Sequence, residues 1–199
     1  MYVDELNFPA VSTGGGGGAS GVFADEYTGD LGIPGSAKST LGGDIGFFYD
    51  PRLAATKAYD FGGISGPAQN PGGVNNFYFG FGLKLPAITD AYFGAYVNAP
   101  GNGTVDVRTF TNLNLTFWGP AELFEKAFTP AIQVVMAGPP VAGCASNSGR
   151  SEVQVIIAAA LKIGAASNYV LPLNGFTLKF ACSGETTVAQ VLEKIAQVN

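Results

Sequence analysis

The stretch that decides the fold runs from Asn112 to Trp118 and reads NLNLTFW. Leu113, Leu115 and Phe117 fall on one side of an extended chain, and the residues between them, Trp118 included, fall on the other. A period of two is typical of a strand that lies half-buried in a sheet, because successive side chains point to opposite faces. The stretch therefore predicts a strand with an apolar inner face and a more polar outer face.

Further segments have the length and composition of strands. Residues Tyr2 to Phe8 alternate in the same way, and Pro9 ends the run. Residues 131–137 are apolar throughout, as expected of a strand buried on both faces. Residues 60–76 are expected to form a loop, because Gly, Pro and Asn cluster there. Additional strands are expected at residues 22–24, 45–49, 76–85, 152–161, 169–173 and 176–180.

One short helix is expected at the C-terminal end. Thr186 or Thr187 can cap its N-terminus, and the helix is expected to run to Val198-Asn199. Its apolar stripe consists of Val188, Val191, Leu192 and Ile195. Many short strands, regular turns and one helix predict an all-β sandwich of two antiparallel sheets, in the jelly-roll arrangement.

Composition supports this fold class and excludes several functions. A chain of 199 residues with 29 glycines and 13% charged residues suits short strands and tight turns. The net charge is −5, with Lys and Arg scattered, which argues against binding to nucleic acid or anionic membranes. No apolar run is long enough to span a bilayer, so membrane insertion is not expected.

Five consecutive glycines, Gly14 to Gly18, divide the N-terminal strand from the rest of the chain. Such a run does not belong inside a regular element, because each glycine loses maximal backbone entropy on ordering. It also lacks the Lys-Ser or Lys-Thr of a phosphate-binding loop. We therefore expect a strand segment at 1–13, a flexible linker at 14–21 and the body of a single domain at 22–199.

The chain has two cysteines, Cys144 and Cys182, and no histidine. Two cysteines alone do not make a zinc site. A reactive thiol is the alternative, but Arg150 is the only close basic neighbour that would lower a thiol pKa. We favour a disulfide, which indicates an oxidising compartment and therefore an extracellular or cell-surface protein. Because the chain opens without a signal-peptide pattern, a signal is expected to have been removed or to lie outside these residues.

Several segments together resemble jelly-roll carbohydrate-binding modules, also called galactose-binding-like domains. Tyr2–Phe8 is similar to the final strand of these modules, and residues 22–27 are similar to their opening strand. Residues 113–118, 169–176 and 188–198 are similar to a central strand, a late strand and the segment before the closing strands. The resemblance covers most of the chain thinly. It implies a β-sandwich that binds a bacterial polysaccharide or cell-surface glycan.

The order of these segments departs from the family. The closing-type strand stands first, and the chain ends after the helix where closing strands would follow. One explanation is a circularly permuted domain, whose first and last strands still meet. The other is a repeat or filament subunit whose first strand completes another copy of the chain.

The resemblance also implies a structural calcium ion. In such modules an Asp of the closing strand helps to hold calcium together with acids near the opening strand. The matching residues are Asp4, Asp25 and Glu26, and their oxygen atoms are suitable ligands. The alternative is that Asp4 accepts backbone hydrogen bonds while the other two are solvated.

Aromatic residues beside polar ones are the main signal for sugar binding. The apolar C–H faces of a sugar ring stack on flat side chains, while polar neighbours bind its hydroxyl groups. For Trp118, a place in the core is an equally good interpretation. The candidate ligand-binding residues are Trp118, Tyr49, Asp50, Arg52, Tyr59, Asp60 and Tyr78.

The sequence therefore predicts a non-catalytic, secreted glycan-binding module. The alternative is a structural subunit that assembles by strand addition between copies. Without histidine, Ser-His-Asp and Cys-His catalysis are excluded. Paired-carboxylate glycoside hydrolysis remains formally open. Its candidate acids are Asp25, Glu26, Asp44, Asp50, Asp60 and Asp90, and most of them lie in turns.

Overall fold

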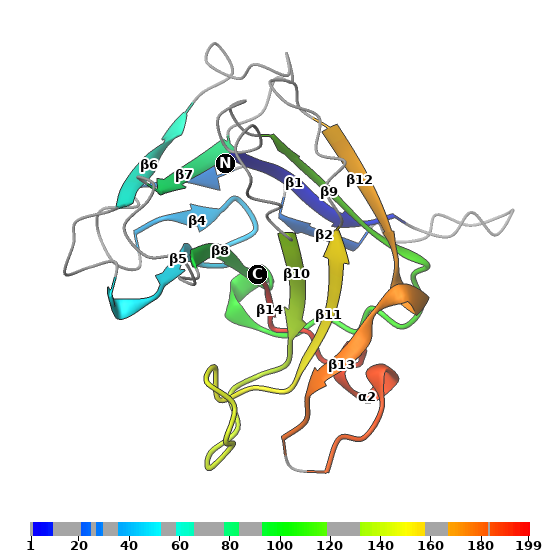
Figure 1. Cartoon of the computed structure of the whole chain (residues 1–199). Helices are drawn as coiled ribbons and strands as arrows, with labels where there is room; N and C mark the ends of the chain where they lie inside the picture. The colour runs from blue at the N-terminus through cyan, green and yellow to red at the C-terminus, as the bar shows by residue number, and fades with distance from the viewer. Residues whose placement is uncertain are drawn as a thin grey trace, which may run out of the picture.

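A computed structural model describes residues 2–9, 21–24, 27–29, 36–52, 59–65, 78–83, 93–118, 132–157, 167–182 and 184–199. Two antiparallel sheets of six strands make up most of this described part (Figure 1). The all-β sandwich predicted from the sequence is confirmed, whereas its jelly-roll topology stays a prediction. In the described part of the chain, no helix has the length and apolar character needed to cross a membrane.

The first sheet, called sheet 1, contains the N-terminal strand near its middle. Its order is β12-β9-β1-β7-β6, and β2 also pairs with β1. The strands are β1 (Tyr2–Phe8), β2 (Gly21–Ala24), β6 (Tyr59–Ser65), β7 (Tyr78–Leu83), β9 (Asn112–Trp118) and β12 (Ser167–Pro172).

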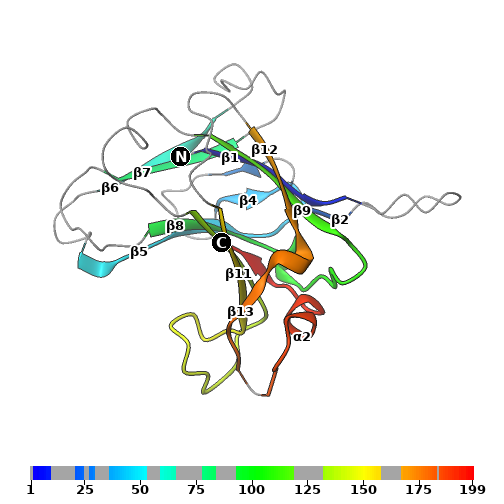
Figure 2. The same ribbon diagram turned by 45° about the vertical axis from the view of Figure 1, so that its right-hand side comes forward.

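The second sheet, called sheet 2, has the order β13-β11-β10-β14-β8-β5. Figure 2 shows the two sheets as separate layers. A small two-stranded ribbon, β3 (Tyr27–Thr28) with β4 (Lys38–Ser39), accompanies them. The strands of sheet 2 are β5 (Ile45–Tyr49), β8 (Phe93–Asn98), β10 (Ile132–Ala137), β11 (Glu152–Ile157), β13 (Thr177–Phe180) and β14 (Gln197–Val198).

Strand β1 pairs within its own chain. Leu6 lies opposite Leu115 of β9, and Tyr2 lies opposite Gly80 of β7. The predicted strand at 2–8 is therefore confirmed, and it occupies an interior position of sheet 1. The proposed linker at 14–21 lies outside the described residues except for Gly21, which begins β2.

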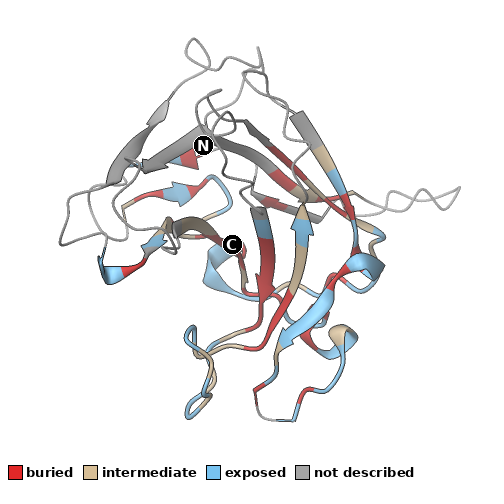
Figure 3. Ribbon diagram, in the orientation of Figure 1, coloured by how far each residue is buried: buried red, intermediate tan, exposed pale blue. Residues whose placement is uncertain are grey.

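The core lies between the two sheets and follows the alternation of the sequence. Leu113 and Leu115 of β9 are buried, as predicted from NLNLTFW. Phe8 of β1 is fully buried and packs edge-on against Phe23 of β2, with ring centroids 6.1 Å apart. Sheet 2 contributes buried residues along β10 and β11, among them Met136 (Figure 3). This shared core holds the sheets together and fixes which of their faces point outward.

The C-terminal helix α2 (Val188–Leu192) is shorter than predicted. Thr187 caps it in a capping box, in which Gln190 is the reciprocal partner. The chain then leaves the helix, because Ile195 exchanges two backbone hydrogen bonds with Val105. The expectation that the helix continues to Val198-Asn199 is therefore wrong. So is the expectation that no closing strand follows it, because β14 inserts between β10 and β8.

Two further expectations require correction. Residues 59–65 form β6 although a loop was expected from residue 60 onward. Strand β8 was not expected, although Phe93, Ala95 and Val97 alternate with Gly94, Tyr96 and Asn98. Among the described residues, two short 3-10 turns connect strands, η2 (Pro100–Asn102) and η4 (Leu173–Gly175).

Candidate functional site

The predicted ligand-binding residues are divided between the two sheets. Tyr49 ends β5 in sheet 2, opposite Phe93 of β8. The other aromatic candidates and Asp60 are placed in sheet 1 by their backbones, and their side chains lie outside the described residues. Tyr59 and Asp60 belong to β6, Tyr78 to β7 and Trp118 to β9.

Asp50 and Arg52 bind each other directly. The Arg52 backbone N–H donates to Oδ1 of Asp50 at 2.9 Å, and Nε of Arg52 donates to both carboxylate oxygens at 2.9 and 3.0 Å. These hydrogen bonds, the side-chain ones first, hold the pKa of Asp50 below its ordinary value. The side chain of Asp50 is also largely buried, so this pair stabilises the turn after β5 rather than presenting a free carboxylate.

The proposed calcium ligands are only partly within the described residues. Asp25 and Glu26 lie outside them, and Asp4 is described only through its backbone in β1. The register between β1 and β9 shifts between Val3 and Leu6, so counting back from Leu6 does not fix the face on which Asp4 lies. Among the described residues, no group of three His, Cys, Asp or Glu side chains is placed to hold a metal ion.

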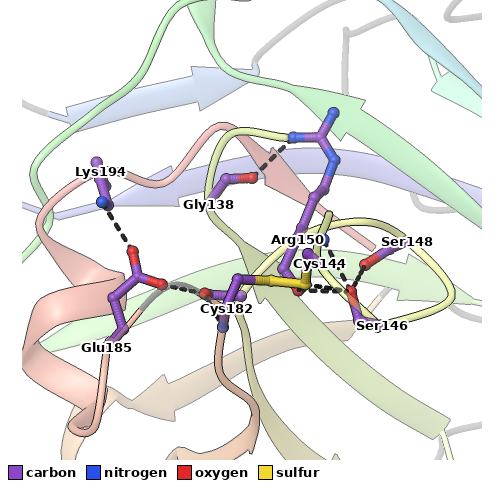
Figure 4. Close-up of a disulfide and its surroundings, with 9 residues drawn as sticks. Gly138, Cys144, Ser146, Ser148, Arg150, Cys182, Glu185 and Lys194 are labelled. Carbon is purple, nitrogen blue, oxygen red and sulfur yellow. Dashed lines mark hydrogen bonds and ion pairs between the residues drawn. A yellow bond between two sulfur atoms is a disulfide. The ribbon is translucent and has the colours of Figure 1, made fainter. Parts of the chain in front are cut away.

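The predicted disulfide between Cys144 and Cys182 is confirmed (Figure 4). Their Cα atoms are 5.3 Å apart, and the bond joins the loop between β10 and β11 to the segment after β13. Closing a loop of 38 residues stabilises the fold by about 4 kcal/mol in the chain-entropy model. The bond fixes one end of sheet 2.

A buried hydrogen-bond network lies next to the disulfide. Ser151 donates its hydroxyl hydrogen to a carboxylate oxygen of Glu185 and accepts the backbone N–H of Cys182 at 2.8 Å. Lys194 binds the other Glu185 oxygen at 2.7 Å. The bonds from Lys194 and then Ser151 hold the pKa of Glu185 below its ordinary value. This network joins Ser151, the residue before β11, to the segments on both sides of α2.

The outer face of sheet 2 carries a crossed arrangement of aromatic residues and glycines on β5 and β8. Gly46 lies opposite Tyr96, and Phe48 lies opposite Gly94. The neighbouring Phe47 packs against the core, so alternation places these four residues on the outer side. Each strand therefore contributes one aromatic ring and one glycine to the same face.

Each ring occupies the space above the glycine of the other strand. A Cβ added at Gly46 would lie 2.6 Å from Oη and 2.7 Å from Cζ of Tyr96. A Cβ added at Gly94 would lie 2.9 Å from Cε1 of Phe48. The glycines thus let both rings cover the backbone of the adjacent strand. Phe48 keeps 39% of its surface accessible and Tyr96 is half-buried, so the pair forms an exposed aromatic surface, here called the aromatic platform.

Polar side chains, together with the exposed Ile156, occupy the part of this face over β10, β11 and β13. Gln133 donates to Oε1 of Gln154 at 2.5 Å, and both residues are on the outer side of their strands. Lys179 forms an ion pair with Glu152 at 3.0 Å and also donates to Gln133 at 3.5 Å. The outer face of sheet 2 thus combines exposed rings at one end with hydrogen-bonding and charged groups at the other.

A separate groove of about 570 Å³ lies between the 108–112 segment, η4 and α2. It is lined mainly by apolar residues, including Phe110, Leu173 and Val188. Arg108, its charged residue, is bound to Asp106 at 2.7 Å and to Glu193 at 3.4 Å. Because its cation is neutralised and its lining is mostly apolar, the groove is a weaker candidate than the aromatic platform.

Sequence reasoning missed Phe48 and Tyr96. The signal was a repeated pattern, Gly46-Phe-Phe48 and Gly94-Ala-Tyr96, in which glycine precedes an aromatic residue by two positions. Such a pattern places the glycine and the ring on the same face of a strand. Only the antiparallel register shows that each ring lies over the other strand's glycine.

Comparison of the chain with models of protein families, with curated proteins and with solved structures finds no match. The fold defines an all-β sandwich with one disulfide. Its function is therefore inferred from the side chains on its faces, of which the aromatic platform is the most distinctive.

Proposed function

We propose that this chain is a non-catalytic glycan-binding module of a secreted protein, and that its aromatic platform binds the sugar. The crossed pairs Gly46–Tyr96 and Phe48–Gly94 carry the proposal. An aromatic ring has a negative face, which attracts polarised C–H groups such as those on the flat side of a sugar. Two exposed rings that cover neighbouring strands offer a surface of this kind.

The chemistry around the platform supports sugar rather than an apolar partner. The amides of Gln133 and Gln154 and the ion pair of Lys179 with Glu152 lie on the same face of sheet 2. These groups can donate and accept hydrogen bonds to hydroxyl groups. A sugar, with an apolar face and a rim of hydroxyl groups, matches this combination.

The disulfide supports a location outside the reducing cytoplasm. Disulfides persist in oxidising compartments and are rare in cytosolic proteins. The bond between Cys144 and Cys182 is therefore the basis for proposing an extracellular or cell-surface location, where glycans are abundant. Calcium at Asp4, Asp25 and Glu26 remains part of the proposal as a structural ion without a role in chemistry.

A glycan array followed by titration calorimetry tests the proposed function. We expect the protein to bind at least one polysaccharide, and Phe48→Ala and Tyr96→Ala each to weaken binding about tenfold or more, because burial of an aromatic ring contributes about 1.5–3 kcal/mol. Val170→Ala is the matched control, because Val170 is an exposed apolar residue on the other sheet. Trp118→Ala, tested in parallel, examines the candidate in sheet 1.

Two results would contradict the proposal. One is the absence of binding to any glycan of the array by protein that is folded and disulfide-bonded. The other is glycan binding that both platform variants leave unchanged. Concentration-dependent polymers without glycan binding, detected by light scattering, would favour a structural subunit instead.

A further inference from the structure

Arg150 differs from the other cationic side chains of the described residues. It alone has no carboxylate within salt-bridge distance, and its guanidinium donates instead to the backbone carbonyl of Gly138 at 2.7 Å. The remaining described cations are paired, as Lys38 with Asp44, Arg52 with Asp50, Arg108 with Asp106 and Glu193, Lys179 with Glu152 and Lys194 with Glu185.

Arg150 is also held in place by the loop that carries the disulfide. Oγ of Ser146 accepts the backbone N–H of Arg150 at 2.8 Å and donates to its carbonyl oxygen at 2.9 Å. Figure 4 shows the guanidinium turned toward Gly138 and away from the bond between Cys144 and Cys182. A fixed backbone reduces the entropy that the side chain loses when it binds a ligand.

The guanidinium of Arg150 is half-buried without a counter-ion. Burial lowers its pKa because it removes water from the cation, whereas the nearby Glu152 and Tyr96 act to raise it. A guanidinium has five N–H donors, and one hydrogen bond to a carbonyl leaves most of them available. A half-buried cation of this kind gains from an anionic ligand, which restores the interactions that water provided.

Arg150 lies at the end of sheet 2 where the loop after β10 returns to β11. Glu152 is on the outer side of β11, because the next residue, Val153, is buried on the inner side and successive side chains of a strand point to opposite faces. Arg150 lies in the bend that precedes β11, and its guanidinium reaches back to the carbonyl of Gly138, directly after β10. Strand β8, which carries Tyr96, is three strand spacings from β11, or about 14 Å between backbones. The ring of Tyr96 leans toward β5, and its row of the sheet contains Gln154 of β11, so Arg150 also lies about 13 Å farther along the strands. A glycan that reaches both residues must therefore extend over several sugar units.

We propose that the glycan bound by the aromatic platform is acidic, and that Arg150 binds a sugar carboxylate while more distant units of the same chain stack on Phe48 and Tyr96. The proposal rests on the proposed function. The planar guanidinium can donate two parallel hydrogen bonds to a carboxylate, which a lysine cannot do. Glu152 does not oppose such a ligand strongly, because Lys179 neutralises it at 3.0 Å.

The overall charge of −5 makes this recognition local. A protein with a negative net charge does not attract polyanions over long distances. Binding of an acidic glycan therefore requires a specific cation, and Arg150 is the one that the described residues leave without a carboxylate. Removal of this single charge is expected to abolish the preference for acidic over neutral sugars.

The experiment compares pairs of polysaccharides that differ only in charge. Titration calorimetry would use polygalacturonate and alginate, each beside its methyl-esterified form, and dextran sulfate beside dextran. We expect the wild type to bind one uronate polymer about tenfold or more tightly than its ester. This is the fold-change in affinity expected from one hydrogen bond to a charged group. Arg150→Gln is expected to bring the two affinities to within about threefold of each other.

Two control variants separate the role of Arg150 from general effects of charge and stability. Arg108→Gln removes the same charge from a paired residue and should preserve the preference. Arg150→Lys keeps the charge but loses the planar fork, so it should give an intermediate ratio. Thermal unfolding of each variant shows whether it is folded, and Arg150→Lys carries the test if Arg150→Gln does not fold.

The outcomes distinguish this inference from the function on which it rests. The role of Arg150 is refuted if the wild type binds an acidic polymer and its ester equally. The glycan-binding function still stands in that case if Phe48→Ala weakens binding to both polymers. Preference for dextran sulfate over every uronate would also overturn the carboxylate assignment. Failure to bind any of the polymers, or any glycan of the array, overturns both proposals.

Discussion

The ring of Phe48 lies over Gly94, in space that a side chain on β8 would otherwise occupy. Gly94→Ala would force the ring to move, because the new methyl group cannot be accommodated 2.9 Å from Cε1. Such overpacking typically costs about 1–3 kcal/mol. We expect urea unfolding to show this loss and glycan binding to weaken with it.

Gly175→Ala provides the control for that substitution. No atom lies within 4 Å of the Cβ that it would add. Its free energy of unfolding should therefore stay within about 0.5 kcal/mol of the wild type. Equal stability of the Gly94→Ala and Gly175→Ala proteins would contradict the position of Phe48.

Glu185 makes the stability of the fold depend on pH. Its pKa in the folded protein lies below the ordinary value of 4.5, mainly because Lys194 and Ser151 bind the carboxylate. A lowered pKa means that the stabilisation is complete above the unfolded-state pKa and is lost as the pH falls toward the folded-state value. Glu185→Gln should therefore lower the melting temperature most at neutral pH, and the difference should shrink below about pH 4.5.

Glu193→Gln is the matched control, because Glu193 is exposed and pairs with Arg108 at a distance of 3.4 Å. Pairs of this kind contribute about 0–1 kcal/mol. Its melting temperature should follow that of the wild type across the same pH range. A Glu185→Gln effect that is equally large at pH 3 and pH 7 would refute the assigned direction of the pKa shift.

The bond between Cys144 and Cys182 should dominate the response to reduction. Replacement of both residues by serine is expected to lower the free energy of unfolding by about 4 kcal/mol, because the unfolded chain regains the freedom of a 38-residue loop. Chemical unfolding with and without a thiol reductant measures this loss. The reductant should destabilise the wild type and leave the double variant unchanged.

Phe8 tests whether β1 belongs to its own sheet. It is fully buried, so Phe8→Ala should cost about 3–5 kcal/mol in the free energy of unfolding. Ile156→Ala removes an apolar side chain that is 56% exposed and should change stability by less than about 0.5 kcal/mol. A neutral Phe8→Ala substitution in monomeric protein would place β1 outside the sandwich.

Strands whose side chains alternate or are uniformly apolar could be predicted from the sequence. The predicted boundaries at residues 2–8 and 45–49 agree with β1 and β5. The runs 112–118 and 131–137 agree with β9 and β10 to within one residue. In these segments the sequence of the strand itself indicates which of its residues are buried.

The missed strands depend on their neighbours. In β8, Phe93, Ala95 and Val97 do alternate with Gly94, Tyr96 and Asn98, but the small side chains of Gly94 and Ala95 make this signal weak, and the space above Gly94 is filled by Phe48 of β5. Strand β14 has two residues, too few to show any period. It forms because Gln197 and Val198 find open positions between β10 and β8. Such pairing depends on contacts between distant parts of the chain and cannot be seen in the sequence of one strand. The aromatic platform was not predicted for the same reason.

Arg150 illustrates why the candidate site was harder to predict than the fold. Its neighbours in the sequence, Ser151 and Glu152, include a carboxylate two positions away. Asp50 with Arg52 and Asp106 with Arg108 have the same spacing and do form ion pairs. Glu152 instead binds Lys179 from another strand, and this choice leaves Arg150 without a carboxylate.

Strand β14 divides sheet 2 into two unequal parts. On one side lie β8 and β5 with the aromatic platform, and on the other lie β10, β11 and β13 beside Arg150. The short segment from Ala196 to Asn199 connects them within the sheet. A glycan that binds to both parts would link them and stabilise the pairing of β14 with its neighbours. Its binding should slow the hydrogen exchange of the Val135 and Asn199 amides, which close the ladder between β10 and β14.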